Sequence, residues 1–169
     1  MHAFEIKYSG KKSKRTFPTT FLIKILFVSI IIIWILGFLY PILFNKQFDL
    51  TNYIFKRIYS PVCHQDHNKC ITINSNEMLV CARCAGIYFG ALIAGLSALI
   101  FQFTSIKIKT LLIFLVPLIV DVSFTMVGIY SYSKTIAFTT GLIFGSIVSL
   151  FLLYEIESLF LNKPIQKNE

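Results

Sequence analysis

Four cysteines and two histidines between residues 63 and 84 are the part of the chain best equipped for chemistry. Cys63 and His64 are adjacent, and a Cys-x-x-Cys pair, Cys81 and Cys84, follows after a spacer. Such a pair at the start of a helix places two sulfurs on one side of a ligand, and the helix N-terminus favours their thiolate forms. A remote pair of soft donors can complete a tetrahedron around a metal ion. The spacing therefore predicts a metal site formed by Cys81 and Cys84 together with a remote pair, for which Cys63 and His64 are candidates.

The ligand set and the metal stay open at this point. Cys63 and His64 both reach one ion only if the backbone turns between them, and His67 or Cys70 could replace either. We expect zinc, which tetrahedral cysteine and histidine sites commonly hold, although sulfur-rich donors also suit Cu(I). Such a site would pin its loop to the protein and have a structural or ligand-sensing role.

The same cysteines allow thiol chemistry instead of metal binding. Cys81 and Cys84 at a helix start suit a membrane thiol-disulfide oxidoreductase, with Cys63 and Cys70 as a second pair. Disulfide-generating membrane enzymes of the quinone-linked and vitamin K epoxide reductase types are loosely similar. Purely structural disulfides are a third alternative. Whether the protein is an enzyme is therefore undecided by the sequence.

Long apolar runs must position these residues. The chain has 169 residues, of which 56% are hydrophobic and 14% are charged, against about 45–50% and about 25% in soluble domains. A helix of about 20 residues crosses the hydrocarbon core of about 30 Å, and uncharged or nearly uncharged runs of that length occupy residues 25–44, 85–104, 111–130 and 135–154. We therefore predict an all-α integral membrane protein, a bundle of about four transmembrane helices.

The first two predicted spans are joined by a long loop, residues 45–84, which contains every cysteine. The chain thus divides into a basic N-terminal segment (1–20), a membrane domain that includes the loop (21–161) and a tail (162–169). Apolar and charged residues alternate over 48–58 as in an amphipathic helix at the membrane surface. Short connections between the last three spans predict a tight antiparallel meander.

Lysine and arginine are distributed unevenly between the two ends of these spans. Ten of the sixteen basic residues fall on the side that holds both termini. The positive-inside rule therefore predicts a multi-pass protein of the inner (plasma) membrane with both termini in the cytoplasm. This topology and anionic lipid headgroups account for the net charge of +8, so we expect the bilayer as partner and no nucleic acid.

Asp121 is an acid well inside the third predicted span. Inserting a carboxylate at that depth of the membrane costs about 2.5–3.5 kcal/mol of free energy. Asp121 should therefore face the bundle interior and have a partner or be protonated. One interpretation is a proton relay, or a ligand or polar pocket with Gln65 and Arg83 in which Arg83 binds an anion. The other is a structural hydrogen bond for Asp121, with Arg83 offsetting thiolate charge.

Small residues recur at every fourth position along two of the predicted spans, at 86–98 and at 141–149. Small residues at that spacing let helix backbones approach closely. Contact between these two helices of one chain is the first interpretation. A homo-oligomer formed through the same faces is the alternative.

Two stretches of the sequence carry a recognisable pattern. Cys63-His64-Gln65 is the first, and the second consists of Cys81, Ala82, Arg83, Cys84, Ala85, Gly86, Ile87, Tyr88 and Gly90. This pattern resembles the signature of the multi-pass bacterial membrane proteins catalogued as domain of unknown function 2085, although Thr is usual in place of Ala85. Pro117 and Asp121 resemble the Pro and Asp of that family's third span, and the resemblance covers roughly residues 50 to 150.

The resemblance implies a shared set of Cys63, His64, Cys81 and Cys84. Cys70 would then be an extra, since it and its neighbour stand where the family usually has Arg-Ser. An odd number of shared thiols fits a metal site better than two disulfides. The family name implies no activity.

Overall fold

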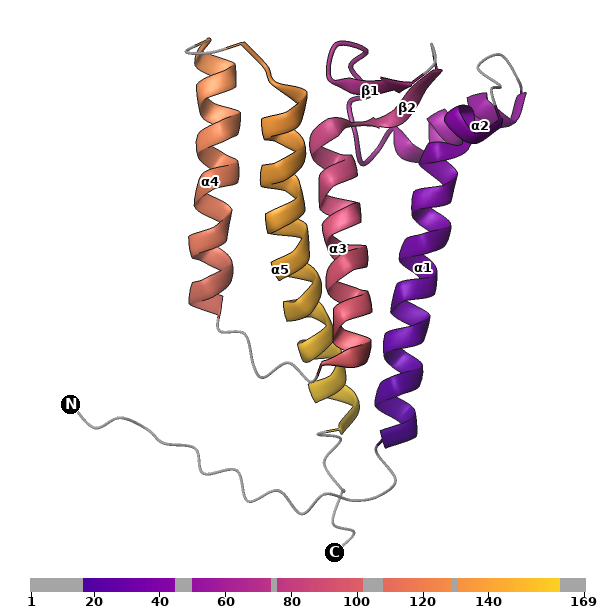
Figure 1. The fold of residues 1–169 in the computed structure, drawn as a ribbon, viewed down its shortest axis with the longest axis vertical. Helices are drawn as coiled ribbons and strands as arrows, with labels where there is room; N and C mark the ends of the chain where they lie inside the picture. The colour runs from indigo at the N-terminus through magenta and orange to yellow at the C-terminus, as the bar shows by residue number, and fades with distance from the viewer. Residues whose placement is uncertain (1–16, 45–49, 74–75, 102–107, 129–130, 162–169) are drawn as a thin grey trace, which may run out of the picture.

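The computed structural model describes residues 17–44, 50–73, 76–101, 108–128 and 131–161 and shows a helical bundle with a small hairpin at one end (Figure 1). The elements in chain order are α1 (Phe17–Phe44), α2 (Leu50–Tyr59), β1 (Cys70–Ile73), β2 (Asn76–Cys81), α3 (Ala82–Ile100), α4 (Ile108–Val127) and α5 (Lys134–Leu161). Within these residues, α1, α3, α4 and α5 are long and apolar enough to cross a membrane. The predicted all-α membrane architecture is therefore confirmed.

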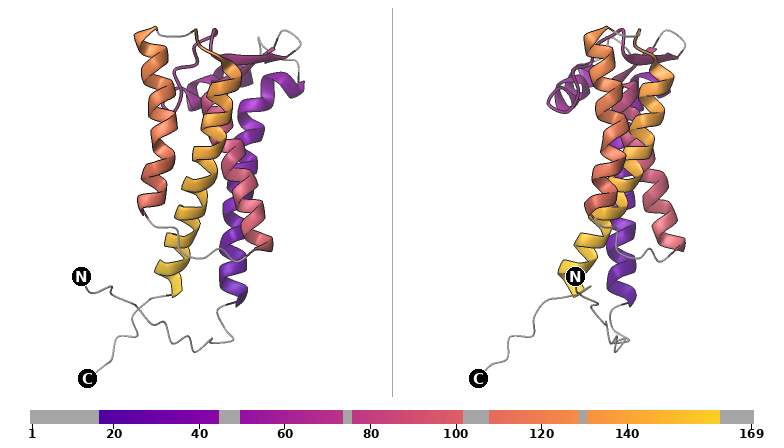
Figure 2. Two further views of the ribbon diagram at one scale, coloured as in Figure 1. Left: turned by 60° about the vertical axis from the view of Figure 1, so that its left-hand side comes forward. Right: turned by 90° about the vertical axis from the view of Figure 1, so that its left-hand side faces the viewer.

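The order of the helices across the bundle differs from the predicted meander. In the view of Figure 1 the helices stand in the order α4, α5, α3 and α1, and in the left view of Figure 2 α3 and α1 overlap on the side of α5 away from α4. α4 and α5 are neighbours, as their short connection predicts, but α5 packs most extensively against α3. The meander was wrong because packing shape, rather than the length of the connections, selects the partner of α3.

Glycine faces on α3 and α5 explain this close packing. A Cβ atom added at Gly90 would lie 2.1 Å from the carbonyl oxygen of Leu142, and one added at Gly145 would lie 2.1 Å from that of Ile87. The hydroxyl of Ser146 also donates a hydrogen bond of 3.1 Å to the carbonyl of Gly90 across the seam. The predicted contact within one chain is confirmed, and it occupies the small-residue faces that the alternative assigned to a homo-oligomer.

The helix α2 lies across one end of α1, and a buried tyrosine anchors it there (Figure 1). The hydroxyl of Tyr59 donates a 2.7 Å hydrogen bond to the carbonyl of Trp34, and the two rings meet edge to face at 4.7 Å. Gly37 makes room for this tyrosine, since a Cβ there would lie 2.2 Å from its hydroxyl oxygen. The predicted surface helix is thus present and docked by its buried side.

The segment between the two cysteine pairs forms an antiparallel hairpin that the sequence analysis did not predict. Its strands pair Cys70 with Cys81 and Thr72 with Glu77, with an irregularity between the two pairs. β2 continues directly into α3, and its buried Met78, Leu79 and Val80 join the apolar cluster at this end of the bundle. The hairpin therefore fixes the start of α3 against α1 and α2.

At the other end of the bundle, one lysine of α1 contacts two further helices. The ammonium of Lys24 in α1 lies 3.3 Å from a carboxylate oxygen of Glu157 in α5 and donates a 2.9 Å hydrogen bond to the carbonyl of Ala98 in α3. This end therefore joins three helices through a single charged group.

Candidate metal centre

Three sulfur atoms from two separate segments meet at the end of the bundle that carries the hairpin. The Sγ atoms of Cys63, Cys81 and Cys84 all lie within 4.8 Å of one another. A metal ion with bonds of about 2.3 Å to each sulfur needs separations of about 3.8 Å, so small side-chain movements would suffice. Three of the four predicted ligands are thus brought together.

The junction of β2 and α3 positions the Cys-x-x-Cys pair. Cys81 ends β2 and is the N-cap of α3, and Cys84 lies in the first turn of that helix. The side chain of Cys81 makes no capping hydrogen bond, so its sulfur is left to the cluster. The partial positive charge at the helix N-terminus lies beside both positions and stabilises negative charge in the cluster that they form.

The C-terminal end of α2 positions the third sulfur. The backbone N–H groups of Val62 and Cys63 donate to the carbonyl of Tyr59 at 3.1 and 3.0 Å, which curls the chain toward α3. Gln65 then takes a left-handed backbone conformation, with φ of 50°, that is uncommon for a residue other than glycine. Its side-chain amide donates a 2.9 Å hydrogen bond to the carbonyl of Lys56 and so caps α2. The structure therefore gives Gln65 a role in shaping the turn.

Hydrogen bonds concentrate negative charge on the sulfur of Cys63. This sulfur accepts a 3.1 Å hydrogen bond from the backbone N–H of Cys81. The thiols of Cys81 and Cys84, followed by backbone groups that include the N–H of Gln65, lower the pKa of Cys63. The hydrogen bond between the side chains of Cys81 and Cys63 is the largest cause that raises the pKa of Cys81. The cluster thus consists of one thiolate, Cys63, that accepts hydrogen bonds from two thiols. A metal cation can bind all three sulfurs by displacing the protons of the thiols.

The remaining predicted ligands lie outside this cluster. His64 is exposed and is not part of the group of donors close enough to share an ion. The ring nitrogen Nδ1 of His67 lies 2.5 Å from a carboxylate oxygen of Glu77 at the surface. Cys70 is buried in β1, and burial raises the pKa of its thiol to about 12. These three side chains therefore do not belong to the group of donors that could share an ion in this structure.

Arg83 lies between the two cysteines but extends toward α4. Its guanidinium forms an ion pair with the carboxylate of Asp121, which is only 7% exposed. Asp121 thus faces the interior and has the partner that its depth requires. The guanidinium carbon of Arg83 also lies 5.9 Å from the centre of the Tyr132 ring, and the ammonium of Lys69 lies 6.0 Å from the same centre.

Tyr132 is a residue of the site that the sequence analysis missed. It lies in the short connection before α5, and burial raises the pKa of its hydroxyl to about 12. Charges on Cys81, Arg83 and Asp121 also act on it, so it borders both the sulfurs and the ion pair. The only signal in the sequence was an aromatic residue in a short polar connection.

Comparison with known proteins adds a family and two archaeal relatives. A family model described as "Predicted membrane protein (DUF2085)" matches residues 63–151. The uncharacterized protein MJ1492 of Methanocaldococcus jannaschii is 34% identical over 100 residues, which cover 57% of this chain and 64% of that protein. An uncharacterized protein of Methanothermobacter thermautotrophicus is 27% identical over 83 residues, or 48% of this chain and 75% of its own.

The chain spans less than two thirds of the length of the Methanocaldococcus relative. No solved structure matches the chain. The residues that the family model matches extend from Cys63 through α3 and α4 to most of α5, so they include the three sulfurs and Asp121.

Proposed function

The chain belongs to the DUF2085 family of predicted membrane proteins, and we propose that its function depends on a metal ion bound by Cys63, Cys81 and Cys84. The observation that carries the proposal is the approach of three sulfurs to within 4.8 Å from segments separated by the hairpin. Soft sulfur donors select zinc or Cu(I) over harder cations, and zinc is the ion we expect.

The fourth position on the ion decides what kind of site this is. Structural zinc sites are closed by four protein ligands, whereas catalytic and ligand-binding sites keep one position open. His64 remains the predicted fourth ligand, and its exposed ring would have to turn toward the sulfurs. A water molecule in its place would leave the site open to an incoming ligand.

A structural or ligand-sensing role follows from the elements that the ion would join. Cys63 extends from the end of α2, and Cys81 and Cys84 begin α3, so one ion would tie α2 to the hairpin and to α3. Arg83 belongs to the same turn and reaches Asp121 in α4. Binding of a metal or of a further ligand would therefore act on α4 through this ion pair, and Arg83 and Asp121 form the polar part of the proposed site.

The decisive experiment measures metal content and free thiols on the same purified chain. We expect about one zinc per chain in the native protein, and loss of the metal in Cys81→Ser and in Cys84→Ser. Cys70→Ser is the matched control, because Cys70 is a buried cysteine outside the cluster, and it should retain the metal. A native protein without metal, or equal loss in all three variants, would overturn the proposal.

His64→Ala distinguishes a closed site from an open one. If His64 is a ligand, this variant should lose metal affinity by about 10-fold or more, whereas an open three-thiolate site should keep its metal. The comparison variant is His67→Ala, since His67 is engaged with Glu77.

A thiol-disulfide oxidoreductase is the second candidate function, and the position of the Cys-x-x-Cys pair at a helix N-terminus favours it. In that reaction the thiols of Cys81 and Cys84 would lose two electrons and two protons and form a disulfide. A disulfide of a partner protein would gain them and become two thiols. Metal-free protein with a reversible Cys81–Cys84 disulfide would support this function over metal binding.

We propose that the cluster faces the outside of the plasma membrane, because basic residues gather at the opposite end of the spans. After metal removal, a membrane-impermeant thiol reagent should label the protein in intact cells. Labelling that requires lysed cells would show that the cluster faces the cytoplasm instead.

A further inference from the structure

The helix α2 has two different apolar faces, and only one of them is used inside the protein. Tyr59 is buried against α1, and the ring of Phe55 lies 5.2 Å from that of Tyr40. The opposite face exposes large apolar side chains, with exposed fractions of 74% for Leu50, 71% for Tyr53, 51% for Ile54 and 47% for Ile58. Something other than this chain's described residues must cover that face.

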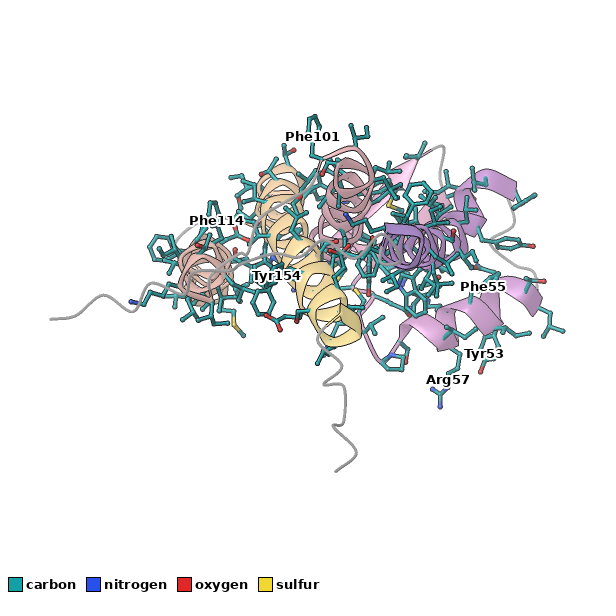
Figure 3. All side chains as sticks on the ribbon, turned by 90° about the horizontal axis from the view of Figure 1, so that it is seen from below. Tyr53, Phe55, Arg57, Phe101, Phe114 and Tyr154 are labelled. Carbon is teal, nitrogen blue, oxygen red and sulfur yellow. The ribbon has the colours of Figure 1, made fainter. Side chains whose placement is uncertain are left out.

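Arg57 stands in the middle of this exposed apolar face. It follows Ile54 by three residues and Tyr53 by four, which places all three side chains together on one side of the helix. In Figure 3 Tyr53 and Arg57 extend away from the bundle, whereas Phe55 lies on the side of α1. A cation surrounded by exposed apolar groups is the pattern of a side chain that buries its stem and keeps its charged end at a polar layer.

The place of α2 in the fold identifies that layer. The apolar part of α1, Thr20–Phe44, has 25 residues and is about 37 Å long, which exceeds the hydrocarbon core of about 30 Å. α2 follows the end of α1 and lies across the bundle rather than along it (Figure 1). When α1 spans the hydrocarbon core, its excess length leaves the exposed face of α2 at the depth of the lipid headgroups.

The described part of the chain offers no acidic partner to the charges of α2. α2 contains no acidic residue, and Lys56 and Arg57 are both exposed. Arg83, the other arginine that the structure describes, has a carboxylate partner, but no acidic side chain in the described part of the chain pairs with Arg57. Cations in the last turn of a helix interact favourably with the helix dipole. This interaction does not explain the apolar residues around Arg57.

We propose that α2 binds an anionic phospholipid, with the guanidinium of Arg57 on the lipid phosphate. The planar guanidinium matches a phosphate with two parallel hydrogen bonds, and Lys56 adds a second positive charge. Leu50, Ile54 and Ile58 enter the boundary between headgroups and acyl chains, where an amphipathic helix is stabilised by buried apolar area and by anionic lipids. The site is separate from the sulfur cluster and does not depend on metal binding.

The test compares phosphatidylglycerol with phosphatidylcholine, each added in mixed micelles to the delipidated full chain. Native mass spectrometry then counts the bound lipids. We expect the unmodified protein to retain phosphatidylglycerol more tightly, and Arg57→Gln to lower that affinity about fivefold while phosphatidylcholine binding stays unchanged. Lys109→Gln, at an exposed basic residue of α4, is the matched control and should keep the preference. Equal affinity for the two lipids, or equal losses in Arg57→Gln and Lys109→Gln, would overturn the proposal.

A second variant tests the apolar part of the site. Ile54→Asn should reduce retention of both lipids, because it removes an apolar side chain that contacts the acyl region. Unchanged retention would mean that this face meets water and would overturn the assignment. Since Ile54 and Arg57 are exposed, both variants should keep the thermal stability of the parent protein, which verifies the fold.

Discussion

The helices α4 and α5 are neighbours of similar apolar character, but the rest of the protein holds them by different means. α5 lies against α3 so closely that carbonyl oxygens of one helix fill the positions of missing Cβ atoms on the other. α4 has one buried residue among its described side chains, Asp121, and the ion pair of that residue with Arg83 ties α4 to α3 past α5. One helix is therefore fixed by shape and the other by charge.

This difference shows what a hydropathy pattern omits. Apolar length identifies a span, but inside a bilayer lipid tails are as apolar as leucine, so apolar contact does not choose between partners. Small residues and a single charge make that choice here. Substitutions that affect the shape of α5 or the charge of α4 should therefore have different signatures.

Gly145→Ile should have the largest effect. The added side chain would collide with the backbone of α3 at Ile87, which cannot yield as a flexible side chain can. We expect a loss of about 4 kcal/mol or more in the free energy of unfolding in detergent, together with aggregation in size-exclusion chromatography. Gly95→Ala is the control, because a Cβ there would meet side chains and no backbone, a methyl of Val28 at 3.0 Å and the ring of Phe27 at 3.7 Å, and should cost less than about 1 kcal/mol. Equal losses would show that the seam between α3 and α5 is not held by shape.

Asp121→Asn and Arg83→Gln should each have an intermediate effect. Each variant leaves one charge without its opposite charge, the buried carboxylate or the partly buried guanidinium, at a cost of up to about 3 kcal/mol, and the double variant should cost less than the sum. Hydrogen exchange should rise in α4 and stay slow in α5, because the seam with α3 is untouched. Additive losses, or faster exchange spread evenly over both helices, would contradict the role of this ion pair as the tether of α4.

Lys24→Met should have a smaller effect at the opposite end of α5. Its side chain and that of Glu157 are 15% and 22% exposed at the polar end of the bundle, where we expect the partly solvated pair to contribute about 1 kcal/mol. Hydrogen exchange should rise only in the last turns of α5. Lys109→Met, at a lysine outside this pair, is the control. If Lys24→Met lost as much unfolding free energy as Asp121→Asn, α5 would also be held by charge.

Thr125→Val should have the smallest effect. The hydroxyl of Thr125 donates a 2.7 Å hydrogen bond to the carbonyl of Asp121 within α4, so its loss changes no contact between helices. We expect a change within about 0.5 kcal/mol. A loss near that of Asp121→Asn would indicate that the hydroxyl supports the carboxylate itself.

The sequence predicts the spans, the surface helix and the contact between the small-residue faces, because each depends on a pattern within one helix. The position of α5 between α3 and α4 could not be predicted, since the connection lengths say which helices follow one another and not which surfaces fit. The hairpin was missed because Met78, Leu79 and Val80 are all buried, so β2 lacks the alternation that marks a strand.

The sulfur cluster was predicted more completely than its surroundings. Cys81 and Cys84 occupy one helix turn, so their spacing alone brings the two sulfurs together. Cys63 and His64 are adjacent, and adjacent side chains leave the backbone in different directions, which explains why the structure brings in the cysteine and leaves the histidine exposed. The ion pair of Arg83 with Asp121 joins residues 38 positions apart, a distance over which no local pattern operates.

That separation of 38 residues also sets an order of events during synthesis. At about 5–20 residues per second, Arg83 leaves the ribosome about 2–8 s before the carboxylate that will neutralise it. An unpaired arginine enters the bilayer at a cost of about 2.5–3.5 kcal/mol near the centre of a helix, and less near its end. We therefore expect the first turn of α3 to stay at the membrane boundary until α4 arrives with the carboxylate of Asp121.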